Sequence, residues 1–137
     1  MDESKTPEPS VEGIVSRPSR FSVEVTLAHL QEAIHSRNLT LFAHIDHSGE
    51  AKRVGLTMQA AHVLIFGNPK GGTPLMIASP LLALDLPLRV LVWQGTDNQV
   101  GVSSTSVDFL RDRYALPKEL AGNLGVIDVV IEQALNG

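Results

Sequence analysis

The stretch that decides the fold begins with Leu39-Thr-Leu-Phe-Ala-His-Ile-Asp46 and continues with His62-Val-Leu-Ile-Phe66 and Leu86-Pro-Leu-Arg-Val-Leu-Val-Trp93. Each of these three segments is short, apolar and rich in branched or aromatic residues, which is typical of β-strands. Gly95-Thr-Asp-Asn98 then supplies the residues of a tight turn and predicts a hairpin whose return strand covers residues 99–104. The strands therefore cluster in the middle of the chain.

Apolar residues at helical spacing flank this cluster on both sides. The spacing predicts an early helix capped by Ser22, and a last helical stretch that follows Pro117. The apolar positions are Val23, Leu27, Leu30 and Ile34 in the first helix and Leu124, Ile127, Ile131 and Leu135 in the last. A first strand is predicted at residues 11–16, stopped by Arg17-Pro18. Strands that cluster rather than alternate with long helices favour an α+β fold in two layers.

Length and composition set limits on the class of protein. The 137 residues predict a flexible N-terminal tail at residues 1–10 and a single domain at residues 11–137. The net charge is −4 and no basic run is longer than Lys52-Arg53, so nucleic acid is not an expected partner. The chain has no cysteine, which excludes disulfides, thiolate zinc sites and cysteine nucleophiles. No apolar run reaches the length of a membrane span and no secretory signal opens the chain, so we expect a cytoplasmic protein without a membrane partner.

His44, Asp46 and His47 form the first candidate group for chemistry. A carboxylate beside an imidazole orients the ring and raises its basicity, as a general base or a metal ligand requires. The structural alternative is that His47 caps the following turn while Asp46 accepts hydrogen bonds from Ser48 or Gly49. These three residues are the catalytic candidates, and no metal or cofactor is assigned to the chain.

The glycine-rich segment at residues 67–73 is the second candidate site. Its glycine spacing resembles that of a phosphate-binding loop, but Thr73 stands where that motif requires lysine. Thr73-Pro74 also predicts a helix start, whose free amides could hold an anion together with Lys70. The alternative is a plain tight turn. The candidate ligand-binding residues are Asn68, Lys70, Gly71, Gly72 and Thr73.

Four motifs together identify a family resemblance. They are Phe42-Ala-His-Ile-Asp-His47, Leu64-Ile-Phe-Gly-Asn-Pro69, Gly72-Thr-Pro-Leu-Met76 and Ala83-Leu-Asp-Leu-Pro-Leu-Arg89. In this order they resemble the DUF302 family of uncharacterised proteins. The resemblance implies a fold of the TATA-box-binding-protein class, with a curved, mainly antiparallel sheet and helices on one side. It implies no activity. The chain has Asn38 where the family usually has glycine, and both residue types adopt the left-handed conformation.

The residues described above are compatible with three functions. The first is a module that binds a small molecule or an anionic ligand between the sheet and the loop at residues 67–73, lined by His44, His47, Asn68 and Lys70. The alternatives are a small enzyme that uses a His/Asp general base, and a homodimeric interaction protein. Whether the chain is an enzyme is left undecided by the sequence.

Overall fold

The predicted strands form one antiparallel sheet in the computed structural model, which describes residues 10–137. The five strands lie in the order β1-β5-β4-β3-β2, and every neighbouring pair is antiparallel. Their bounds are β1 Ile14–Ser19, β2 Thr40–Asp46, β3 Ala61–Gly67, β4 Leu88–Gln94 and β5 Val100–Thr105. The hairpin between β4 and β5 is confirmed, and so is the predicted α+β class.

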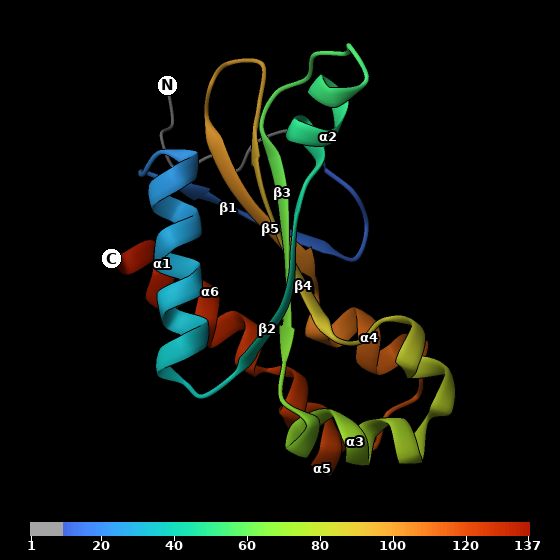
Figure 1. The fold of residues 1–137 in the computed structure, drawn as a ribbon. Helices are drawn as coiled ribbons and strands as arrows, with labels where there is room; N and C mark the ends of the chain where they lie inside the picture. Colours follow the sequence, from blue (N-terminus) through green and yellow to red (C-terminus); the bar gives the residue numbers. More distant parts are fainter. Residues whose placement is uncertain (1–9) are drawn as a thin grey trace.

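Two long helices lie side by side along one face of the sheet (Figure 1). They are α1 and α6, and shorter helices join the strands at the two ends of the molecule (Figure 1). The bounds are α1 Val23–Ser36, α2 His47–Arg53, α3 Pro69–Ala78, η1 Pro80–Leu84, α4 Val107–Arg113, α5 Lys118–Ala121, η2 Gly122–Leu124 and α6 Val126–Asn136. Among the helices of residues 10–137, none has the length and apolarity needed to cross a membrane.

The core lies between this helix pair and the sheet. Leu64 and Phe66 of β3 are fully buried there, together with Val90 of β4. Leu30 of α1 and Val130 of α6 belong to the same cluster and are also fully buried. Because side chains alternate along a strand, the residues between these positions point to the opposite face of the sheet.

That opposite face is mainly apolar and partly exposed, and we call it the open face. Its apolar side chains are Ile45, Val63, Ile65, Leu91 and Trp93, and the exposed Arg89 of β4 lies beside Ile65 on the same face. These residues border a broad hollow that extends to Ser16 of β1 and Ser103 of β5. The indole Nε1 of Trp93 donates a hydrogen bond to Ser103 Oγ at 2.8 Å, and Ser103 is also hydrogen-bonded to Ser16. The polar groups at the β4–β5–β1 side of this face are therefore paired with one another.

Two predicted elements are misplaced, because β1 begins at Ile14 rather than at residue 11 and α3 begins before Thr73. β1 continues through Pro18 to Ser19, because β1 is an edge strand that pairs only with β5, and an edge strand tolerates a residue without an N–H. The helix expected at Thr73-Pro74 begins instead at Pro69, with Asn68 as its cap. Asn68-Pro69 has the same chemistry as Thr73-Pro74, a side-chain acceptor followed by proline, and the chain uses the earlier pair.

We predict that Leu30→Ala lowers the free energy of unfolding by about 2–5 kcal/mol, because it leaves a cavity between α1, α6 and the sheet. Leu30 is 0% exposed, whereas Val25 on the same helix is 41% exposed. Val25→Ala is therefore the matched control and should change stability by less than about 1 kcal/mol. Urea denaturation followed by circular dichroism measures both, and equal losses in the two variants would contradict this account of the core.

Candidate functional site

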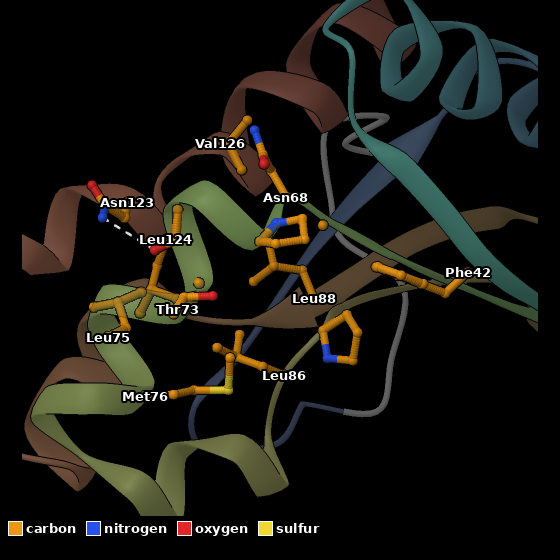
Figure 2. Close-up of a pocket in the computed structure, with 15 residues that line it drawn as sticks. Phe42, Asn68, Thr73, Leu75, Met76, Leu86, Leu88, Asn123, Leu124 and Val126 are labelled. Atoms are coloured by element: carbon orange, nitrogen blue, oxygen red, sulfur yellow. Dashed lines mark hydrogen bonds between the residues drawn. The ribbon is translucent and has the colours of Figure 1, made fainter.

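A pocket of about 200 Å³ lies where β3 ends and α3 begins. Its wall combines the first turns of α3 with the Leu86-Pro87 segment before β4 and with the junction of η2 and α6 (Figure 2). Most of the wall is apolar. The lining residues are Phe42, Gly67, Asn68, Pro69, Gly71, Gly72, Thr73, Leu75, Met76, Leu86, Pro87, Leu88, Asn123, Leu124 and Val126.

An irregularity in β2 brings Phe42 to this pocket. The register of β2 against β3 shifts between Leu41 and Ala43, so Phe42 is an extra residue in the strand. A bulge of this kind bends the strand and redirects a side chain. The aromatic ring of Phe42 consequently forms one side of the pocket, facing Leu88 across it (Figure 2).

Three polar side chains stand among the apolar ones. Asn68 caps α3, and its Oδ1 accepts a hydrogen bond from the backbone N–H of Lys70 at 3.0 Å. Asn123 donates from Nδ2 to the carbonyl oxygen of Gly71 at 3.1 Å and thereby ties η2 to α3. Thr73 is the third, one turn into α3 (Figure 2).

Four of the five predicted ligand-binding residues line this pocket. They are Asn68, Gly71, Gly72 and Thr73, whereas Lys70 is exposed and lies outside the lining. The amides of Gly71 and Gly72 both donate to the carbonyl of Asn68, at 3.0 and 2.9 Å. The expectation of free amides at a helix start beside Lys70 is therefore wrong, because these amides are already engaged in the first turn of α3. The role of these residues in binding stays a prediction.

The structure separates His44 from His47. His44 pairs with Leu64 in the β2–β3 ladder and therefore points to the helix side of the sheet, whereas His47 borders the hollow over the open face. Neither residue lines the pocket at α3. The predicted convergence of His44, His47, Asn68 and Lys70 on one cleft is therefore wrong.

His62 is the residue that sequence reasoning missed. Its Nδ1 lies 2.9 Å from Nε2 of His44, and its Nε2 lies 3.7 Å from Oδ1 of Asp46. The separation between His44 and His62 along the sequence gives no reason to expect a contact between them. Only the register of β2 against β3, which pairs Asp46 with His62, brings these side chains together.

Asp46 has the structural role that was left open as an alternative. Its carboxylate caps α2, with Oδ1 accepting from Ser48 Oγ at 2.7 Å and from the Gly49 N–H at 2.8 Å. The hydrogen bond from Ser48, followed by that from Gly49, holds the pKa of Asp46 below its ordinary value, and the neighbouring imidazoles of His62 and His44 act in the same direction. His47 is the first residue of α2 and not its cap. In the part of the chain that the structure describes, no three or more His, Cys, Asp or Glu side chains gather as a metal site.

Asp85 contacts Tyr114 and Arg113 instead of the pocket at α3. It accepts a hydrogen bond from the hydroxyl of Tyr114, and Arg113 lies 3.5 Å from the same carboxylate oxygen. The bond to Asp85 raises the pKa of Tyr114. Asp85 does not line the pocket at α3.

Comparison with known proteins identifies similar chains. The model of a family described as "Domain of unknown function DUF302" matches residues 15–134. A solved structure of an uncharacterised conserved DUF302 protein from Bacillus stearothermophilus superposes with a TM-score of 0.76 over 92% of this chain and 98% of that one, at 13% identity. The similarity to that structure shows the fold.

Two curated relatives carry a functional name. The "Fluoride-specific ion channel FluC 1" of Brucella suis is 34% identical over 104 residues, which cover 76% of this chain and 41% of that protein. The "Fluoride-specific ion channel FluC 2" of Brucella melitensis is also 34% identical over 104 residues and is covered to 38%. The chain thus spans about two fifths of the length of the curated relatives it matches.

We predict that the stabilising effect of the Asp46 carboxylate is lost in acid. The pKa of Asp46 is lower in the folded chain than in the unfolded chain, where it is roughly 4. At a pH above the unfolded pKa, the charged carboxylate therefore stabilises the fold. This stabilisation disappears as the pH falls through the folded pKa. Asp46→Asn is the informative variant, because asparagine caps a helix about as well as aspartate but carries no charge. The stability difference between wild type and Asp46→Asn, measured by urea unfolding, should shrink from about pH 6 to about pH 3. A difference that does not change with pH would contradict the prediction.

Proposed function

Because the chain belongs to the DUF302 family, whose function is unknown, we propose its function from the pocket: it is a binding module for a small, mainly apolar molecule. One observation carries this proposal. None of the 15 residues that line the pocket has a titratable side chain. Acid–base catalysis needs a group that accepts or releases a proton at the reacting atom. A pocket without such a group supports binding over catalysis.

The size of the pocket indicates the size of the ligand. An apolar protein cavity of about 150 Å³ is large enough for benzene. At about 200 Å³, this pocket is suited to a molecule of one substituted ring or a short branched chain. Phe42, Met76 and Leu88 supply the apolar contacts around it (Figure 2).

The polar side chains favour a ligand with one hydrogen-bonding group. Because Oδ1 of Asn68 is held by the cap of α3, its Nδ2 is the end that is left as a donor. Because Nδ2 of Asn123 is bonded to Gly71, its Oδ1 is left as an acceptor. A few such groups in an apolar wall fix the orientation of a ligand and provide specificity.

The names of the Brucella relatives add one ligand to be tested. The two Brucella proteins are named as fluoride-specific ion channels, and the matched segment accounts for about two fifths of each. Fluoride is then a necessary probe in any ligand screen, alongside the small apolar molecules.

We predict that phenol stabilises the wild-type chain and that filling the pocket abolishes the effect. A Cβ at Gly72 would lie 3.7 Å from Leu86 Cδ1 and 3.9 Å from Met76 Cε, which is ordinary van der Waals contact. Because Gly72, Leu86 and Met76 all line the pocket, we expect the rest of the side chain in Gly72→Leu to extend into it. At about ten times its dissociation constant, phenol should add about 1.4 kcal/mol of stability. Thermal unfolding with and without phenol measures the effect.

The control for this experiment is Gly122→Leu. A Cβ at Gly122 has no atom within 4 Å, so the new side chain projects into open space and should leave binding unchanged. Toluene, sodium fluoride and sodium phosphate complete the screen. Stabilisation by fluoride or phosphate that persists in Gly72→Leu, without any response to phenol or toluene, would overturn the apolar pocket as the binding site.

Self-association is the second candidate function, and the open face favours it. Its residues are mainly apolar side chains, from Ile45 on β2 to Trp93 on β4, with Arg89 as a charged group among them. In a twofold-symmetric dimer, the open face of one copy packs against the open face of the other. The indole N–H of Trp93 would not be left unpaired in this contact, because it is bonded to Ser103 within its own chain. We propose a homodimer through the open face.

We predict that Ile45→Arg converts such a dimer to a monomer, because it places a charge at the buried contact. Ile45 is 37% exposed on the open face, whereas Val129 on α6 is 42% exposed on the other side of the molecule. Val129→Arg is the control and should remain dimeric. Size-exclusion chromatography with light scattering decides between the two states. A monomeric wild-type protein, or a dimer that survives Ile45→Arg, would exclude this interface.

A further inference from the structure

His44 and His62 bring two imidazole rings together on the helix side of the sheet, away from the pocket. They belong to adjacent strands and are diagonal neighbours, because the ladder pairs His44 with Leu64 and Asp46 with His62. The ring centroids lie 5.1 Å apart, and Nε2 of His44 faces Nδ1 of His62 at 2.9 Å. His44 is exposed, whereas the side chain of His62 is only 16% exposed.

Asp46 determines which nitrogen of His62 is free. Its Oδ1 lies 3.7 Å from Nε2 of His62, and Ser48 and Gly49 hold this carboxylate in place. A carboxylate beside one ring nitrogen favours the proton at that nitrogen, which leaves a lone pair on the other. Nδ1 of His62 then accepts the hydrogen bond from Nε2 of His44, and a metal ion would replace the proton of that bond.

We propose that His44 and His62 bind one divalent late transition-metal ion, with Asp46 positioning His62 from the side opposite the metal. Bonds of about 2.0–2.1 Å from a metal to two nitrogens 2.9 Å apart enclose an angle of about 90°. That is the angle between neighbouring ligands in square-planar and octahedral complexes, which suits Cu²⁺ and Ni²⁺. Water supplies the other ligands at the exposed His44 side.

Asp46 would act on the metal through His62 and not as a third ligand. A histidine ligand commonly donates its second N–H to a carboxylate, which fixes the orientation of the ring and increases its basicity. Asp46 Oδ1 lies 3.7 Å from Nε2 of His62, beyond hydrogen-bonding distance, so a small movement would be needed for this bond. The negative charge of Asp46 also attracts a cation. With two protein ligands rather than three, the bound ion should exchange readily with solution.

Titration of the purified chain with Ni²⁺, followed by calorimetry, tests the proposal. We expect one ion per chain in the wild type and at least about tenfold weaker binding in His44→Ala and in His62→Gln. Asp46→Asn should weaken binding by about tenfold while keeping both nitrogen ligands. Electron paramagnetic resonance of the Cu²⁺ complex counts those nitrogens: two in wild type and Asp46→Asn, one in His44→Ala.

Two other histidines provide matched controls. His47 is adjacent in sequence but lies on the opposite face, and His35 lies in the last turn of α1. His47→Ala and His35→Ala should bind Ni²⁺ within about twofold of wild type. Wild-type affinity in His44→Ala, which changes only an exposed side chain, would overturn the proposal even if His62→Gln failed to fold. An equal loss in His47→Ala would also overturn it, and unchanged affinity in Asp46→Asn would remove the positioning role of Asp46.

Discussion

Leu64 and Phe66 are buried beneath α1 and α6, and this burial fixes the register of β3 against both of its neighbours. The other features depend on that register. It turns Val63 and Ile65 to the open face and brings His62 opposite Asp46. A slip of one residue would exchange the two faces of β3 and break up the core. Packing of the core therefore also determines the positions of the residues in the candidate sites.

Much of the fold could be predicted because it is encoded locally. The strands at β2, β3 and β4, the Ser22 cap and the turn before β5 each follow from short patterns. The start of α3 was misplaced, because Asn68-Pro69 and Thr73-Pro74 offer the same capping chemistry and local sequence cannot rank them. Four of the ligand-binding residues predicted at residues 67–73 line the pocket at α3, and their role in binding stays a prediction.

The composition of the two sites could not be predicted because it depends on contacts between distant segments. Phe42 reaches the pocket only through the register shift in β2, and Asn123 only through its bond to Gly71. Alternation along β2 did place His44 and Asp46 on one face, but their neighbour His62 comes from the pairing of two strands. The apolar pocket and the imidazole pair lie in separate regions, so a substitution in one leaves the residues of the other unchanged.

The two edges of the sheet limit how the chain associates with others. β1 carries Pro18, which has no N–H to offer to an incoming strand, and β2 is interrupted at Phe42. Proline and bulges at edge strands are devices that prevent a sheet from being extended by another chain. Growth of this sheet into a continuous multi-chain ladder is therefore disfavoured at both sides. Any association between copies would therefore use surfaces other than the strand edges.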